Sequence, residues 1–202
     1  MFVQVIKGQV SDAAAARAHF ETWMKDLAPG ATGWLGSTAG VTDDGTLVVL
    51  ARFESEEAAR KNSERAEQGA WWEAAEKMFT GDPEFHDSSH VELDLQGDPD
   101  EAGFVQVMQG RTTDPERARA LMADDTVDWH GFRPDILGSV NLEHDGDAWT
   151  MALYFTSEEE ARAGESKQPP PEMEKVMQEL EQISAGEPTY LDLKDPWLHG
   201  PS

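Results

Sequence analysis

The 202-residue sequence has no cysteine and few basic residues, and each shortage excludes several kinds of protein. Without cysteine there is no disulfide, thiolate nucleophile, iron–sulfur cluster or cysteine-type zinc site. The 16 Lys and Arg residues are outnumbered by 40 Asp and Glu residues, which gives a formal net charge of −24. This charge repels nucleic-acid phosphates and anionic lipid surfaces, so we expect neither nucleic acid nor membrane as a partner.

Long apolar segments and targeting signals are also missing. The best apolar run, Leu47 to Ala51, is far shorter than the roughly 18 residues of a membrane span. Residues 2–7 already alternate like a strand and show no feature of a signal peptide. A cytoplasmic protein is therefore expected, and its 39% hydrophobic residues are enough for a packed core.

Several chemical signatures are absent as well. The sequence has no Gly-rich phosphate loop and no Gly-x-Ser-x-Gly, which argues against nucleotide binding and serine hydrolysis. His86 and His90 would share one face of an extended segment, but two histidines on an acidic loop are more often solvent-exposed than metal-bound. We predict no metal and no cofactor.

The chain carries an internal repeat with an offset of 102 residues. Phe-Val-Gln-Val at 2–5 recurs at 104–107, Leu-Gly-Ser at 35–37 recurs at 137–139, and Phe-x-Ser-Glu-Glu at 53–57 recurs at 155–159. Matches in one unbroken register indicate duplication of a unit of about 100 residues. They predict a first domain at 1–97, a second at 103–194 and a C-terminal tail at 195–202.

Both halves predict the same order of secondary structure. Asp12 and Asp114 are typical helix N-caps, as are Ser55 and Ser157. Asp44-Gly45 and Asp145-Gly146 lie between alternating apolar residues, which is typical of a hairpin turn. The elements expected in the first half are a strand at 2–7, a helix from Asp12, strands at 34–42 and 46–54, a helix from Ser55, and a closing strand at 91–95. The closing strand of the second half is expected at 189–193, and Trp129 to Arg133 are expected to end its first helix.

This order, β-α-β-β-α-β, predicts an α+β fold of two tandem ferredoxin-like units. Each unit would have a four-stranded antiparallel sheet with both helices on one face. The other face needs covering, and two units in one chain can cover each other. We therefore expect a monomer that is an intrachain pseudo-dimer, with further self-association left open.

The repeated strands and the segment Ala51 to Arg60 resemble the dimeric α+β barrel superfamily, especially the antibiotic biosynthesis monooxygenase-like proteins. The stretches 62–72 and 81–86 are similar to those of actinobacterial members without assigned function. The resemblance covers nearly the whole length of both halves. It implies a small-molecule pocket between sheet and helices, as in cofactor-independent oxygenases. The superfamily also includes haem-degrading enzymes and proteins with no known activity, so a noncatalytic binding or interaction module, and less favourably haem degradation, remain alternatives.

Gln4 and its repeat Gln106 are the first candidate site residues, because each is a polar residue on an otherwise apolar strand face. In the relatives that the sequence resembles, an amide on this strand points into the pocket, although the haem degraders carry Asn there. A Gln could orient a substrate oxygen. The alternative is a structural amide that bonds to a neighbouring backbone group.

Trp71 and Trp72 are the second candidate pair, since adjacent helix residues lie about 100° apart and one or both could stack on an aromatic ligand. Plain core filling is the alternative. The second half lacks the pair: an offset of 101 takes Trp72 to Met173.

An apolar stripe at helical spacing in the first helix is expected to face the sheet: Ala16, Phe20, Trp23, Met24 and Leu27. His19 is the candidate for proton transfer, because it adjoins this stripe; packing is its alternative. Arg133 is a lone cation that could bind a substrate carboxylate, or pair with Asp128 or Asp135. The expected partner of the whole site is a small apolar or aromatic molecule.

Overall fold

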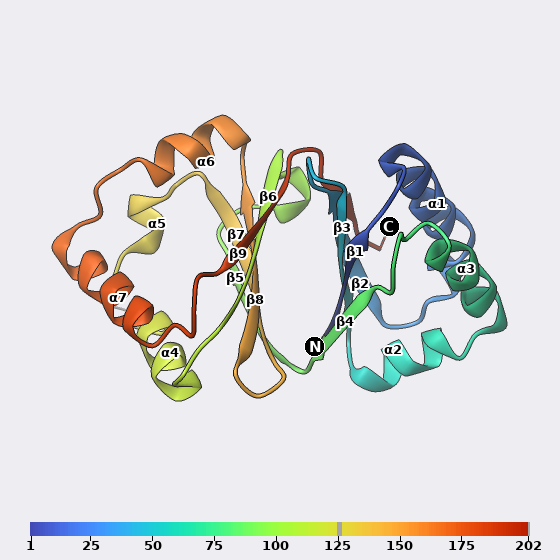
Figure 1. Cartoon of the computed structure of the whole chain (residues 1–202), viewed down its shortest axis with the longest axis horizontal. Coiled ribbons are helices and arrows are strands. Elements are labelled where there is room, and N and C mark those ends of the chain that lie inside the picture. Colours follow the sequence, from blue (N-terminus) through green and yellow to red (C-terminus); the bar gives the residue numbers. More distant parts are fainter. Residues whose placement is uncertain (125–126, 202) are drawn as a thin grey trace. The chain divides into compact units, whose positions relative to one another are not determined.

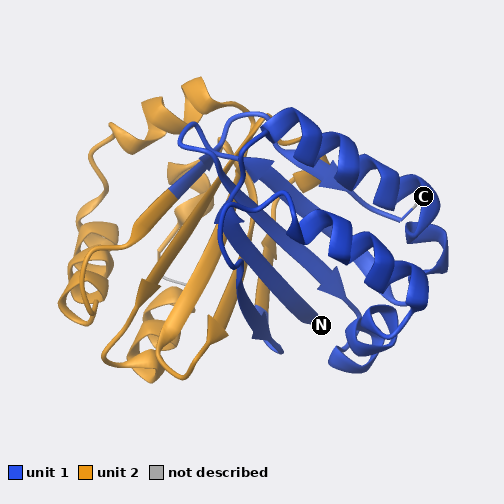
Figure 2. Ribbon diagram, turned by 45° about the vertical axis from the view of Figure 1, so that its right-hand side comes forward, with its two compact units in different colours: residues 1–91, 191–202 blue, residues 92–190 orange. Residues whose placement is uncertain are grey.

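The structure, a computed structural model, describes residues 1–124 and 127–201. These residues form two compact units, one of residues 1–91 with 191–202 and one of residues 92–190 (Figure 2). Each unit is built around a five-stranded antiparallel sheet with helices on one face (Figure 1). The predicted α+β class with two ferredoxin-like halves is confirmed.

The elements of residues 1–101 are β1 (Phe2–Gln9), α1 (Ala13–Asp26), η1 (Ala28–Gly30), β2 (Trp34–Val41), β3 (Thr46–Phe53), α2 (Glu56–Ser63), α3 (Ala66–Glu76), β4 (Glu84–Ser88), β5 (His90–Leu95) and η2 (Pro99–Glu101). Those of residues 102–201 are β6 (Phe104–Arg111), α4 (Pro115–Met122), α5 (Trp129–Phe132), β7 (Ile136–His144), β8 (Ala148–Phe155), α6 (Glu158–Glu165), α7 (Pro171–Gln182), β9 (Thr189–Leu193) and β10 (Trp197–His199). The strand order is β10-β2-β3-β1-β4 in the first sheet and β5-β7-β8-β6-β9 in the second.

The predicted helix starts are confirmed by their capping bonds. Asp12 accepts a hydrogen bond from the backbone N–H of Ala15 at 2.9 Å, and Asp114 accepts one from Arg117 at 3.0 Å. Ser55 and Ser157 cap α2 and α6 in the same way. Each bond satisfies one of the N–H groups that a helix start leaves unpaired.

Both hairpin turns lie where the sequence predicts them. Gly45 has a φ of +87° between β2 and β3, a conformation that glycine adopts without strain. In the second turn Asp145 takes a φ of +54° and Gly146 one of +83°. The turns set the registers of β2 on β3 and of β7 on β8.

The prediction that residues 91–95 close the first sheet is wrong. Its closing strand is β4, which pairs with β1 through registers such as Lys7 opposite Glu84, where the two side chains form an ion pair. The strand ends because the Ser88 hydroxyl bonds both backbone polar groups of His90. Beyond this break β5 pairs with β7 in the second sheet. His86 and His90 therefore do not lie on one continuous strand.

Three further expectations need correction. The second predicted helix of each half is divided in two, as α2 and α3 and as α6 and α7. Residues Trp129 to Phe132 form a separate short helix, because α4 already ends at Met122. Residues 195–202, expected as a tail, contain β10, which pairs with β2.

Among the described residues, no helix combines the length and the apolar character needed to cross a bilayer.

Candidate ligand-binding site

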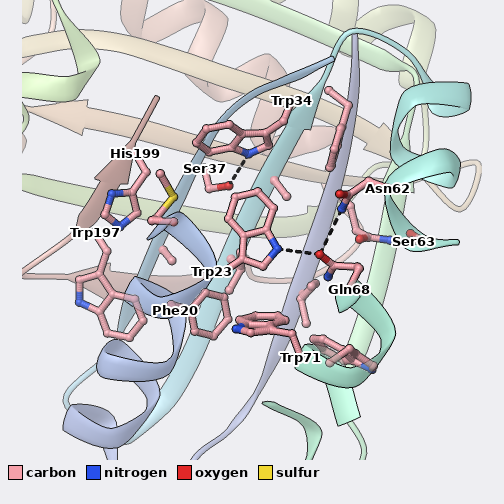
Figure 3. A pocket seen from close by; sticks show the side chains of 18 of the residues that line it. Phe20, Trp23, Trp34, Ser37, Asn62, Ser63, Gln68, Trp71, Trp197 and His199 are labelled. Atoms are coloured by element: carbon pink, nitrogen blue, oxygen red, sulfur yellow. Dashed lines mark hydrogen bonds between the residues drawn. The ribbon is translucent and has the colours of Figure 1, made fainter. Parts of the chain in front are cut away.

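A cavity of about 270 Å³ lies within the first unit, between one face of its sheet and helices α1, α2 and α3 (Figure 3). The residues that line it are Gln4, Ile6, Phe20, Trp23, Met24, Trp34, Ser37, Ala39, Val49, Ala51, Phe53, Asn62, Ser63, Gln68, Gly69, Trp71, Trp72, Phe85, Trp197 and His199. All five strands of the first sheet supply its floor, and the three helices supply its roof.

The floor has a polar row that crosses the sheet from strand to strand. Its lining members lie opposite one another in the strand registers: His199, Ser37, Ala51 and Gln4. Residues directly opposite in paired strands point to the same face of the sheet, and all four side chains line the cavity. On β4 the register continues to Asp87, which is exposed and is not among the lining residues. Ala51 is the small residue of the row and leaves open space beside Gln4.

Apolar residues flank this polar row on both sides. One neighbouring row consists of Trp197, Ala39, Val49, Ile6 and Phe85. The other consists of Trp34, Phe53 and Phe2. The buried members of these two rows belong to two separate hydrophobic clusters. The cavity therefore follows a polar strip between two packed apolar regions.

The roof is held by hydrogen bonds that start from tryptophan and asparagine side chains. The indole N–H of Trp23 donates to Oε1 of Gln68 at 2.6 Å, and Asn62 donates to the same oxygen at 3.4 Å (Figure 3). Asn62 is itself held by Arg65, whose guanidinium donates to its Oδ1 at 2.8 Å. These bonds join α1, α2 and α3 around one end of the cavity.

The lining is aromatic and uncharged. Five of the seven tryptophans of the chain contribute to it, together with Phe20, Phe53 and Phe85. Among the described residues that line the cavity, none is an Asp, Glu, Lys or Arg, although these types make up 28% of the sequence. Since an ion would be left without a countercharge in such a space, the cavity favours a neutral aromatic molecule.

Gln4 lies in the cavity as predicted. Its side chain is half-buried and has no hydrogen-bond partner among residues 1–124 and 127–201. A buried amide is normally bonded, and one left open toward a cavity can bond to a water molecule or a ligand. The structure therefore brings the donor and acceptor of Gln4 to the space that a ligand would occupy.

Trp71 and Trp72 both line the cavity, from α3. Phe20 meets Trp71 edge-on at a ring-centroid distance of 5.1 Å, and Phe85 meets Trp72 edge-on at 5.4 Å. Phe85 lies on the edge strand β4 and is 47% exposed. Trp72 and Phe85 thus place an aromatic pair where the cavity meets solvent.

His19 lies beside the cavity but is not one of its lining residues. Its ring stacks on Trp71 at 4.6 Å, and its Nε2 lies 3.1 Å from the Trp71 carbonyl oxygen. In return the Trp71 indole donates to the His19 carbonyl oxygen at 3.2 Å. These contacts join α1 to α3 and hold Trp71 in position, which is the packing role that the sequence left open.

Gln106 and Arg133 belong to the second unit and do not line the cavity of the first unit. Gln106 is buried and already has a polar partner. It lies opposite Leu153, whereas Gln4 lies opposite Ala51. The larger side chain occupies the position that is open in the first unit.

Arg133 is held by Asp135, one of the two partners that the sequence suggested. The guanidinium donates to both carboxylate oxygens, with 2.7 Å for the shortest contact, and to the carbonyl oxygen of Ala161. It also lies over the ring of Phe155. Burial alone would raise the pKa of Asp135. The hydrogen bonds from Arg133 and from the backbone lower this pKa by more than burial raises it, so the net shift is downward.

Sequence reasoning missed several residues of the cavity. Asn62 and Gln68 carry no local signal, because their role depends on how three helices meet. Trp197 and His199 were assigned to a tail, although the alternation Trp-Leu-His is the period of a short strand. Trp23 was predicted to face the sheet, and it does.

Solved structures of other proteins share this fold over the whole chain. A candidate monooxygenase from Fusobacterium nucleatum is 11% identical with a TM-score of 0.76, covering 100% of this chain and 94% of that one. A candidate monooxygenase from Lactobacillus acidophilus is 13% identical with a TM-score of 0.71, covering 98% of each chain. An anthrone oxidase-like protein is 11% identical with a TM-score of 0.65, covering 100% of this chain and 91% of that one.

No protein-family model and no curated protein matches the sequence. At these identities the structural likeness establishes the fold alone, an α+β fold of two ferredoxin-like halves that these structures share over the whole chain. Fold alone does not establish activity, which has to be argued from the site. The actinobacterial affinity stays a prediction.

Proposed function

We propose that the protein binds a small, neutral, planar aromatic molecule in the cavity of its first unit. The observation that carries this proposal is the composition of the lining: many aromatic rings, no charged side chain, and the open amide of Gln4. Ligand sites are typically apolar clefts in which a few polar groups fix orientation. A core-filling set of aromatic residues would leave neither the cavity nor the amide open.

The size of the cavity narrows the ligand. An apolar cavity of about 150 Å³ holds benzene. At about 270 Å³ this cavity has room for a ring system of two or three fused rings. Trp23, Trp71 and Phe20 offer ring faces and edges against which such a system can stack.

Calorimetric titration with two probes of similar shape tests this proposal. We expect 2-naphthol to bind with one-to-one stoichiometry, and naphthalene-2-sulfonate to bind at least tenfold more weakly because its charge loses hydration without gaining a partner. Quenching of tryptophan fluorescence should follow the same isotherm. Equal affinity for both probes, or no saturable binding of 2-naphthol, would contradict the proposal.

We further propose that the bound molecule is oxidised by dioxygen, as in a cofactor-independent oxygenase. Support comes from the whole-length fold likeness to candidate monooxygenases and to an anthrone oxidase-like protein, and from a cavity that excludes charged groups. The substrate would enter as a neutral molecule and lose a C–H proton to the His199 imidazole in the cavity lining, which then balances the charge of the carbanion. The carbanion would pass its electrons directly to dioxygen. For anthrone the balance is one dioxygen consumed, with anthraquinone and one water formed.

Oxygen uptake with anthrone separates this activity from simple binding. An oxygenase consumes dioxygen and forms anthraquinone in equal amounts, above the rate without protein. If anthrone binds but is oxidised no faster than in buffer, the noncatalytic binding module that the sequence left open is the correct function.

A further inference from the structure

The segment from Leu191 to Pro201 brings a second set of groups to the cavity, from the far end of the sequence. Within it β10 pairs with β2, with Trp197 opposite Ala39 and His199 opposite Ser37. Lys194 anchors the segment to Asp43 at 2.6 Å, and Asp195 pairs with Arg17 of α1. Contacts to both the hairpin turn and a roof helix fix the position of this segment.

Trp197 is the apolar half of this contribution. It is 6% exposed, its ring centroid lies 5.9 Å from that of Phe20, and the Arg17 guanidinium lies over its ring. Its burial stabilises the strand, and its ring forms one wall of the cavity (Figure 3).

His199 is the polar half, and among the described residues that line the cavity it is the one with an imidazole side chain. It begins the polar row of the floor, with Ser37 as its direct cross-strand neighbour. Figure 3 shows its imidazole beside Trp197, on the opposite side of the view from Gln68 and Asn62. Gln4 is three strands away in the same row, about 14 Å at ordinary strand spacing. The lining part of the row thus begins and ends with different polar groups.

We propose that His199 is a specificity-determining residue that recognises a weakly acidic hydroxyl group on the bound ring system. A neutral imidazole nitrogen accepts the hydrogen bond of such a hydroxyl, and the Ser37 hydroxyl lies on the adjacent strand to bond its oxygen. No other lining residue is as strong a hydrogen-bond acceptor. The ligand class is therefore a phenol or an enol, held by its hydroxyl at the β10 end.

This inference rests on the proposed binding function, and the experiment is chosen to separate the two. The probes are 2-naphthol and 2-methylnaphthalene, which differ by a hydroxyl in place of a methyl group. For each protein the measured quantity is the ratio of the two dissociation constants, because this ratio cancels the contribution of ring burial.

Replacing the imidazole by a benzene ring keeps the wall and removes the acceptor. In His199→Phe the ratio should shift about tenfold toward 2-methylnaphthalene, the effect of one hydrogen bond. His199→Gln, which keeps an acceptor, should recover part of the shift. Trp197→Phe should lower the affinity for both probes by the same factor. His130→Gln, which lies outside the cavity, should leave both affinities unchanged.

The results distinguish a wrong role for His199 from a wrong binding function. If both probes bind the unchanged protein and His199→Phe leaves the ratio unaltered with the variant still folded, the role of His199 is wrong and the binding function stands. If neither probe binds the unchanged protein, the binding function fails, and the role of His199 fails with it.

Discussion

Ala51 and Leu153 occupy the same position in the two repeated sheets, opposite Gln4 and Gln106 respectively. The glutamines are identical, yet one faces open space and the other is buried with a partner. The repeated glutamine is therefore exposed to a cavity where the opposite residue is a small alanine, and buried where the opposite residue is a larger leucine.

Filling this space should abolish binding while leaving the protein folded. Ala51→Leu should lower the affinity for 2-naphthol at least tenfold, because the new side chain occupies ligand volume. It should change the free energy of unfolding by less than about 1 kcal/mol, since it enters a cavity and not a packed core. Titration and urea denaturation measure the two effects. Ala14→Leu on the exposed face of α1 is the matched control, and unaltered binding by Ala51→Leu would place the ligand elsewhere.

The two glutamines should respond differently to removal of their amides. Gln4→Leu should leave the urea midpoint unchanged or higher, because the side chain has no partner to lose among the described residues. Gln106→Leu should cost about 1 kcal/mol, because a buried amide loses the interaction that it makes in the folded protein. Equal losses in both variants would show that Gln4 has a structural role after all.

At the scale of elements, the Arg133–Asp135 pair joins the segment after α5 to α6 and β8. The side chains are 13% and 8% exposed, and the guanidinium also reaches the backbone of α6. These contacts make Arg133 part of the framework of the second unit.

Removing Arg133 should destabilise the second unit in a pH-dependent way. The lowered pKa of Asp135 means that its ionised form is stabilised on folding, so the contribution is present above the unfolded pKa of about 3.9. It is lost as the pH falls through the lower folded pKa.

Arg133→Leu should therefore cost about 3 kcal/mol at pH 7 and clearly less near pH 3. Urea denaturation at the two pH values is the measurement. Arg111→Leu, which breaks the exposed Arg111–Asp147 pair, should cost less than about 1 kcal/mol at either pH. A pH-independent loss in Arg133→Leu would assign its role to packing on Phe155 alone.

The elements also show what could be predicted from the sequence. Caps, hairpin turns and the stripe of α1 follow from local chemistry, so Asp12, Gly45 and Trp23 were placed correctly. The partner of a strand is decided by packing over the whole sheet. For that reason neither the break at Ser88 nor the pairing of β10 could be seen locally. Gln4, Trp71 and Trp72 line the cavity, and the sequence singled them out as a polar residue on an apolar strand and an adjacent tryptophan pair; their role in binding stays a prediction.

At the scale of the whole molecule, the charge is shared evenly. Each half of the sequence carries 20 acidic and 8 basic residues, and none of these lines the cavity among the described residues. The surplus therefore belongs mainly to the surface, where like charges repel one another and lower the stability of the folded state.

Salt should stabilise the protein. Raising NaCl from 0.05 to 0.5 M shortens the screening length to a few ångströms and should raise the free energy of unfolding by roughly 1 kcal/mol. Urea denaturation at constant pH is the measurement, and the gain should vanish at the acidic pH where the net charge is zero. A fall in stability with salt would mean that ion pairs outweigh the repulsion.

The two halves keep one fold and differ at the cavity. Tandem repeats that share caps, turns and strands can each vary their side chains without loss of the framework. The aromatic lining, the open Gln4 and the space beside Ala51 are the features of the first unit that support a binding function.

The crystal structure of the complex with 2-naphthol is the most direct measurement of this function. We expect the ring system between the sheet and helices α1 and α3 of the first unit, in contact with Trp71, with its hydroxyl beside His199. A saturated complex whose ring lies outside this cavity, or a cavity without ligand at saturation, would contradict it.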